Sequence, residues 1–226
     1  MKDYLKYTGP VTEEGEARLT GLRERKKELT RQQISAVATA LFQERGFEQV
    51  TVAEVARTAN VSTKTVFNYF PRKEDLYFDR GPQTKALISQ ALEHRAPDET
   101  TLRALWGLAA HLVETRHPLG RISAPQARFW HTVLESPTLR ARLRETTEEA
   151  EAWLGELFAR AEGPAESAPW PAVKAAAAIS VFRTVYGHAL GRFLDGEPEE
   201  TVEADYLSDL RRAFDALERG FDAPAS

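Results

Sequence analysis

Hydroxyl, ammonium and amide side chains gather in one short stretch of the sequence, residues 62 to 69. Thr63, Lys64, Thr65 and Asn68 would lie on one exposed face of a short helix that begins after Ser62. Such groups form hydrogen bonds with base edges and phosphate oxygens, and the backbone N–H groups at the amino end of a helix attract anions. The stretch therefore indicates contact with a nucleic acid.

This helix is the second of a closely spaced pair. Thr51 and Glu54 form a capping box, which predicts that the first helix starts there and ends near Asn60 after about two turns. Ala56 is small enough to lie where the two helices cross. The spacing is typical of a helix-turn-helix. The alternative is an ordinary α-hairpin with solvated polar residues.

The remaining pattern predicts an all-α chain, because apolar residues recur at intervals of three and four. A further capping box, Thr30 with Gln33, predicts a helix that starts at Thr30 and ends at Gly46. A helix from Lys73 is expected to continue with a kink at Gly81 and Pro82. Later helices are predicted over residues 101–116, 125–134, 137–161, 171–194 and 202–219.

Charge divides the chain into unlike parts. The whole sequence has a net charge of -4, yet from Arg18 to Arg80 there are 12 lysines and arginines against 8 acidic residues. The part after Pro82 is acidic. We therefore expect only the amino-terminal third to approach a polyanion.

Motifs of catalytic, metal and membrane proteins are missing from the sequence. With no cysteine it has no disulfide and no thiolate site. HExxH, GxSxG, GxGxxG and the phosphate-binding loop do not occur. No run of 18 apolar residues and no apolar leader is found. We expect no enzyme activity, no metal, no cofactor and no membrane contact, and a location in the cytoplasm, associated with the nucleoid.

Three short motifs follow one another between residues 30 and 76. The first is Leu41, Phe42, Arg45, Gly46 and Phe47, the second is Thr51, Val52, Val55 and Ala56, and the third is Val61, Ser62, Thr65, Phe67, Tyr69, Phe70, Lys73, Glu74 and Leu76. Together they resemble the amino-terminal domain of the TetR family of transcriptional regulators. The resemblance covers about 47 of the 226 residues.

This resemblance implies a three-helix DNA-binding domain whose third helix enters the major groove. Thr63, Lys64 and Phe67 match positions that face bases. The positions that match phosphate contacts are Thr51, Thr65, Asn68, Tyr69 and Lys73, and Ser62 belongs to the same site. Phe67 replaces a common tyrosine and Lys64 a common glycine, which should shift the preferred DNA sequence. For Phe67, packing in the core is the alternative.

The resemblance also implies a larger helical domain that dimerises and binds a small-molecule effector. We expect domains at 30–76 and 77–226, after a basic and partly disordered extension at 1–29. Large rings on the middle helices are candidates for an effector pocket, although such rings usually form the core: Trp106, Phe129, Trp130, Trp153, Phe182 and Tyr186. The candidates for the dimer interface are Phe182, Ala189, Phe193, Leu210 and Phe214, with internal core as the alternative.

Together these features predict a homodimeric repressor that binds a palindromic double-stranded DNA operator and is released by an unknown small molecule. The alternative is a helical small-molecule-binding protein, or an enzyme, that has the same fold without a role on DNA. The two differ in whether Lys64 and Lys73 matter for binding a polyanion.

Overall fold

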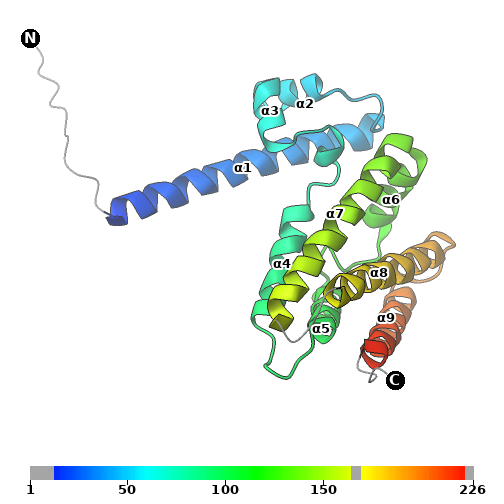
Figure 1. Ribbon diagram of the computed structural model, residues 1–226. Coiled ribbons are helices and arrows are strands. Elements are labelled where there is room, and N and C mark those ends of the chain that lie inside the picture. The colour runs from blue at the N-terminus through cyan, green and yellow to red at the C-terminus, as the bar shows by residue number, and fades with distance from the viewer. Residues whose placement is uncertain (1–12, 164–168, 222–226) are drawn as a thin grey trace, which may run out of the picture. The chain divides into compact units, whose positions relative to one another are not determined.

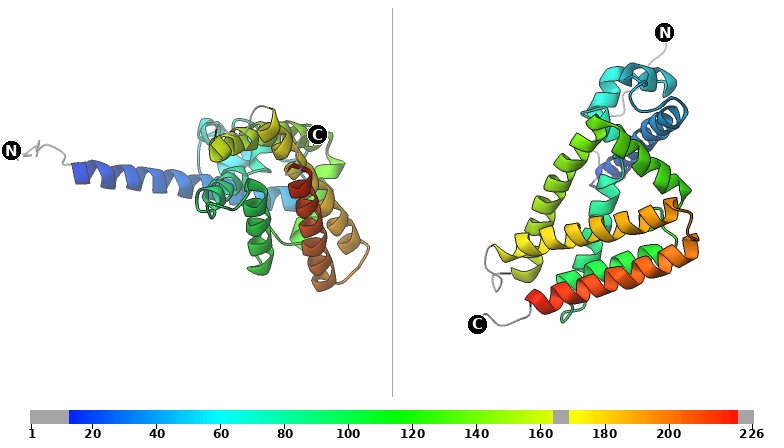
Figure 2. Two further views of the ribbon diagram at one scale, coloured as in Figure 1. Left: turned by 60° about the horizontal axis from the view of Figure 1, so that its bottom comes forward. Right: turned by 90° about the vertical axis from the view of Figure 1, so that its right-hand side faces the viewer.

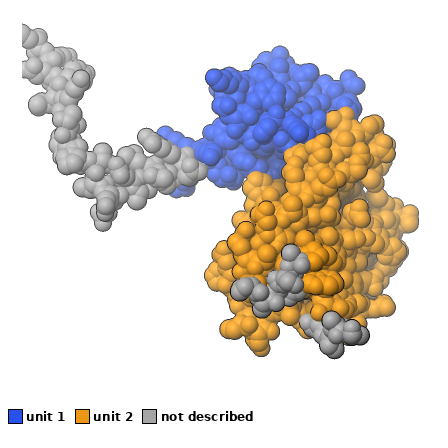
Figure 3. All heavy atoms as spheres, viewed as in Figure 1, with its two compact units in different colours: residues 1–79 blue, residues 80–226 orange. Residues whose placement is uncertain are grey.

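The computed structural model describes residues 13–163 and 169–221, with side chains from Arg25 onward. Every regular element in these ranges is helical, which confirms the predicted all-α class. The chain divides into two compact units, Met1–Asp79 and Arg80–Ser226, called unit 1 and unit 2 below (Figure 3).

Unit 1 contains α1 (Glu13–Arg45), α2 (Val52–Thr58), α3 (Thr63–Tyr69) and a short 3-10 helix, η1 (Glu74–Leu76). The two short helices pack near the carboxyl end of the long α1 (Figure 1). Each helix contributes buried apolar side chains to one small core, which includes Ile34, Ala38, Phe42, Val55, Val66 and Leu76. Burial of this shared core holds α3 in place, because a seven-residue helix is unstable alone in water.

The predicted start of α1 at Thr30 is wrong. The helix begins at Glu13 and passes through this residue, whose hydroxyl donates to the Lys26 carbonyl of the preceding turn at 2.9 Å. Capping residues placed inside a run of good helix formers do not start a helix, because the preceding lysine, arginine, glutamate and leucine residues already favour it. The predicted end is correct, because Gly46 follows the last residue of α1 with a left-handed φ of 82°.

The predicted kinked helix from Lys73 is also wrong. The chain instead forms η1 and then a separate helix, α4 (Gly81–Glu93), with Pro82 in its first turn. Proline is favourable there because the first N–H groups of a helix have no partner within it. Between the two helices, Asp79 is held by α1: its carboxylate accepts from the Ser35 hydroxyl and its carbonyl from the Arg31 guanidinium.

Within the described residues, unit 2 contains α4 and five further helices: α5 (Thr101–Glu114), α6 (Ala124–Glu135), α7 (Pro137–Glu162), α8 (Trp170–Leu194) and α9 (Glu199–Phe221). Their bounds confirm the predicted later helices to within a few residues. In the core α8 packs against both α7 and α9, and α9 also packs against α5 (Figure 2). Buried side chains from these helices form one cluster that includes Leu105, Phe158, Ala178 and Phe214.

A membrane span would need a long helix that is apolar along most of its length. No helix in the described ranges of the chain meets both conditions.

Candidate nucleic-acid interface

The turn between α2 and α3 sets the position of the predicted reading helix. Asn60 adopts a left-handed φ of 55°, a conformation that asparagine tolerates better than most residues. This reverses the chain, so that the Val61 N–H donates to the Ala56 carbonyl at 2.9 Å. On α1, the Gln33 side chain donates to the Ala59 carbonyl at 3.0 Å. The connection is thus held from both sides, as a helix-turn-helix requires.

Ser62 caps α3 as the sequence predicted. Its hydroxyl accepts from the Thr65 N–H at 3.0 Å and lies 2.7 Å from the Thr65 hydroxyl. Both hydroxyls are therefore occupied within the first turn. Their role in the structure is to shape the amino end of the helix, and direct phosphate contact by Ser62 and Thr65 stays a prediction.

The amino-terminal face of α3 is open on the side away from the core. Thr63, Lys64 and Asn68 are exposed, and Val66 on the opposite side is fully buried. Phe67 is 47% exposed, so packing in the core does not account for this residue. An ammonium, a hydroxyl, an amide and an aromatic ring thus lie on one short exposed surface, which we call the α3 face.

Thr51 is exposed at the start of α2, where both halves of the predicted capping box form. Its N–H donates to the Glu54 carboxylate at 2.8 Å, and its hydroxyl accepts from the Glu54 N–H at 3.3 Å. Arg45 adds an ion pair to the same carboxylate at 2.8 Å. The hydrogen bond from the Thr51 backbone and the pairing with Arg45 lower the pKa of Glu54 to about 2. The carboxylate is charged but neutralised locally, which suits a surface near phosphates.

Lys73 is half-buried within unit 1. Its ammonium lies 4.2 Å from the centre of the Phe47 ring and 3.5 Å from the Glu48 carbonyl oxygen. Burial lowers the pKa of Lys73. Its contact with DNA stays a prediction. Tyr69, the other predicted phosphate ligand near this end, is also half-buried.

Sequence reasoning missed three side chains that position this surface. Gln33 binds α2 rather than capping α1, Arg45 neutralises Glu54, and Arg31 lies 5.2 Å from the centre of the Phe70 ring at the end of α3. The ion pair between Arg45 and Glu54 joins residues only nine apart, across the short turn after Gly46. Their spacing in the sequence could therefore have indicated this contact. The contacts of Gln33 and Arg31 join distant parts of the sequence, and no local pattern indicates them.

The rings predicted to line an effector pocket separate into several groups in unit 2. Trp130 lies 5.3 Å from Phe129 and 6.2 Å from Tyr186, as measured between ring centres. Phe182 instead packs against Phe214, with ring centres 5.1 Å apart and the ring planes tilted by 59°. The remaining two are half-buried, Trp106 against the core and Trp153 beneath the Lys85 ammonium. Only the first group forms a continuous aromatic surface.

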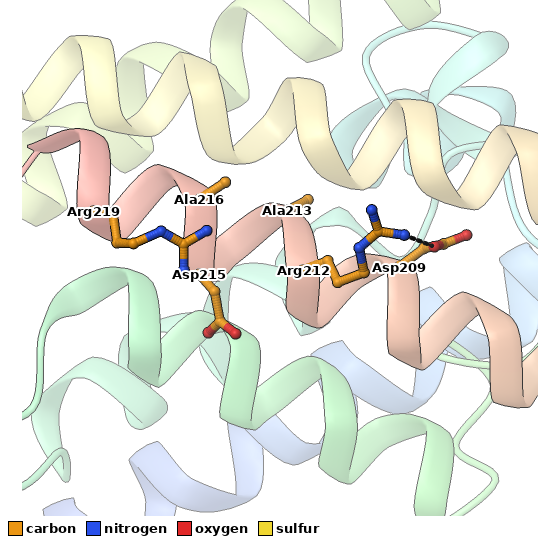
Figure 4. Close-up of a pocket in the computed structure, with 6 residues that line it drawn as sticks. All are labelled: Asp209, Arg212, Ala213, Asp215, Ala216 and Arg219. Atoms are coloured by element: carbon orange, nitrogen blue, oxygen red, sulfur yellow. Dashed lines mark ion pairs between the residues drawn. The ribbon is translucent and has the colours of Figure 1, made fainter.

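Tyr186 closes this aromatic group toward the core. Its hydroxyl donates to the Arg121 carbonyl at 3.2 Å, and burial raises its pKa to about 12. A surface groove of about 560 Å³ lies elsewhere, along α9, and its lining belongs to that helix alone (Figure 4). It includes none of the predicted pocket residues. The effector pocket therefore stays a prediction.

The predicted dimer contacts differ in their accessibility. Leu210, Phe214 and Ala189 are at most 3% exposed and belong to the core of unit 2. Side chains buried in their own chain offer little surface to a second copy. Phe182 and Phe193 are half-buried and retain some accessible surface. A dimer through these helices would have to use the outer faces of α8 and α9.

Comparison with known proteins bears on unit 1 most directly. Residues 34–79 match the model of the family described as bacterial regulatory proteins, tetR family. Residues 34–79 are a TetR-type domain. The match includes the α3 face and the capped starts of α2 and α3, so the TetR-type domain coincides with the predicted reading surface.

Curated relatives of this chain are named transcriptional regulators. The regulator TcmR of Streptomyces glaucescens is 30% identical over 152 residues, which are 63% of this chain and 65% of the relative. The regulator LuxR of Vibrio harveyi is 46% identical over 46 residues, 20% of this chain and 22% of the relative. The chain thus spans less than two thirds of the length of these relatives.

Solved structures share the fold over most of the chain. FadR of Thermus thermophilus, described as a TetR-family transcriptional repressor in complex with lauroyl-CoA, is 24% identical with a TM-score of 0.53, over 87% of this chain and 98% of that chain. SmeT, described as a triclosan complex, is 17% identical with a TM-score of 0.52, over 83% and 91%. At these identities the likeness shows a shared fold alone.

Proposed function

We propose that this chain is a DNA-binding transcriptional repressor that binds a palindromic operator as a homodimer and is released by a small-molecule effector. The main support for the proposal is the α3 face. Its exposed side chains belong to a helix that is held in position by the Ser62 cap, the preceding turn and the buried Val66. The TetR-family match over the same residues supports it. On this proposal the protein acts in the cytoplasm, on the nucleoid.

On the α3 face, the proposed contacts follow from chemistry. The Lys64 ammonium can donate to the O6 and N7 acceptors of guanine in the major groove. Phe67 offers an apolar ring to a thymine methyl group. Thr63 can donate to or accept from a base edge, and the partial positive charge at the amino end of α3 favours an adjacent phosphate. Lys64 and Phe67 are therefore the residues that should determine the preferred sequence.

A palindromic operator requires two copies of α3 related by a two-fold axis. The outer side of α8 is the surface that we propose for this pairing. Val173 is 40% and Leu194 55% exposed near its two ends. Between them, a side chain added at Gly187 or Gly191 would meet nothing within 4 Å, so this side of the helix is open in the single chain.

The effector is proposed to bind near the aromatic group of Phe129, Trp130 and Tyr186. Half-buried rings can stack on an apolar or aromatic molecule, and the Tyr186 hydroxyl supplies a polar group for orientation. An effector shifts the protein from its operator only by binding the DNA-free state more tightly, typically by about 1 to 3 kcal/mol.

Fluorescence anisotropy tests the DNA role. The full chain is titrated against labelled genomic fragments, including its own upstream region, at about 50 and 200 mM salt. We expect saturable binding to one fragment and a changed sequence preference for Lys64→Ala. Arg144→Ala, a change at an exposed cation on α7, is the matched control and should behave like the wild type. Weak binding to all fragments alike, unaffected by Lys64→Ala, would favour a small-molecule-binding role without DNA.

A further inference from the structure

α1 continues far beyond the domain that it supports (Figure 1). The tertiary contacts described for this helix involve Arg31 and later residues: Arg31 binds Asp79, Gln33 binds Ala59, and Ile34 begins the buried face. Residues 13–30 precede all of these contacts. At a rise of 1.5 Å per residue, this segment is about 27 Å long.

The five consecutive residues Arg25, Lys26, Lys27, Glu28 and Leu29 are all exposed. Five residues make more than one full turn of an α-helix, so this turn is open to solvent on every side. A helix with no buried face gains nothing from a core, and a polar helix of this kind is maintained by propensity and local pairs. One such pair is present, because the Gln32 amide donates to Glu28 at 2.9 Å.

The exposed turn lies in the most basic part of the sequence. Residues 18–31 hold six lysines and arginines and two acidic residues. Successive helical residues are about 100° apart, so Arg25, Lys26 and Lys27 cover roughly half of the circumference. A neighbouring polyanion can therefore meet a cation over a wide range of approach directions.

We propose that residues 18–31 of α1, the basic extension, bind the phosphate backbone of DNA next to the operator. The inference rests on the proposed function. Two observations select DNA as the partner: the positive charge, and the continuity of the extension with the helix that carries the TetR-type domain. Because the 14 residues of the basic extension are about 21 Å long and base pairs rise by about 3.4 Å, the contact extends as much as about six base pairs.

The test compares two operator duplexes that differ only in flank length, about 3 and 12 base pairs on each side. The variant Lys26→Gln/Lys27→Gln removes two exposed cations, and glutamine retains the helix propensity. The matched control is Arg140→Gln/Arg144→Gln, which removes two exposed cations from α7 of unit 2 and changes the net charge equally. Circular dichroism checks that all variants remain helical.

On the long duplex, we expect the slope of log K against log salt concentration to be shallower by about 3.6 for Lys26→Gln/Lys27→Gln, since the variant removes two cations from each copy of the homodimer and each phosphate contact contributes about 0.9. On the short duplex its slope should approach that of the wild type, and the control should match the wild type on both.

Three results would overturn the proposal. They are a wild-type slope for the variant on the long duplex, an equal loss on both duplexes, and an equal loss in the control. If the wild type shows no operator preference, it is the proposed function that fails. The extension is then tested separately by the salt slope on long and short non-specific duplexes.

Discussion

Replacing Ser62 with alanine separates the shaping of α3 from the reading of DNA. The serine hydroxyl accepts the Thr65 N–H at 3.0 Å, and alanine has no atom for that bond. An amino-terminal cap of this kind is worth about 1 kcal/mol, within a range of about 0.5 to 2. One kcal/mol lowers the ratio of folded to unfolded protein roughly five-fold. We expect a loss of this size in Ser62→Ala.

Urea denaturation followed by circular dichroism measures this loss. Unit 1 has no tryptophan, because the four tryptophans of the chain are Trp106, Trp130, Trp153 and Trp170. The tryptophan emission of the folded variant should therefore match the wild type, which shows that unit 2 is undisturbed. Thr63→Ala is the control, since Thr63 is the exposed next residue and alanine favours a helix by a few tenths of a kcal/mol.

DNA binding should distinguish Ser62→Ala from a variant of a proposed base contact, Lys64→Ala. Ser62→Ala should weaken operator binding in proportion to its loss of helix stability, and Lys64→Ala should change sequence preference with an unfolding free energy within about 0.5 kcal/mol of the wild type. If Ser62→Ala unfolds at the wild-type urea concentration, or if Thr63→Ala is the less stable of the two, the assignment of the cap is refuted.

Further expected outcomes concern charge and packing. Because the pKa of Glu54 is lowered from 4.5 to about 2, its stabilising effect is complete above pH 4.5 and is lost as the pH falls toward 2; Glu54→Gln should flatten this acid limb of urea stability. Burial raises the pKa of Tyr186 from 10.0 to about 12, so stability should fall as the pH rises between these values. Tyr186→Phe should make that fall smaller, and the rest belongs to Tyr206, whose pKa burial also raises; an unchanged alkaline limb would contradict this. An alanine Cβ at Gly120 would lie 2.6 Å from the backbone carbon of Leu112, so Gly120→Ala should lower the thermal midpoint followed by tryptophan emission. At Gly107, within α5, an added Cβ would meet nothing within 4 Å. Gly107→Ala should therefore raise the thermal midpoint, because alanine stabilises a helix by up to about 1 kcal/mol relative to glycine.

Local signals account for what the sequence predicted well. Ser62 and Thr51 cap their helices because a hydroxyl and an N–H three residues apart meet without help from the rest of the fold. The same reasoning failed at Thr30, where neighbouring turns decide the conformation. A cap is a preference of about 1 kcal/mol, and a long run of helix-forming residues exceeds it.

Tertiary contacts could not be predicted from type and spacing. Leu210 and Phe214 are apolar on the correct side of α9, but periodicity does not distinguish burial against α5 and α8 from burial against a second chain. Lys73 was placed on phosphate by its position in a motif. That its ammonium lies over Phe47 depends on how η1 returns to α1, which no local pattern encodes.

The two units differ in how far apart in the sequence their partners lie, and this difference matters while the chain is being synthesised. In unit 1, Arg45 meets Glu54 nine residues later, and every helix is complete by Leu76. In unit 2, Thr100 and Arg103 at the start of α5 bind Glu218 near the end of α9. α5 therefore waits for more than a hundred further residues before its partner exists. Unit 1 can form as soon as it leaves the ribosome, and the faces of α5 and α8 that pack against α9 stay uncovered until this last helix is made.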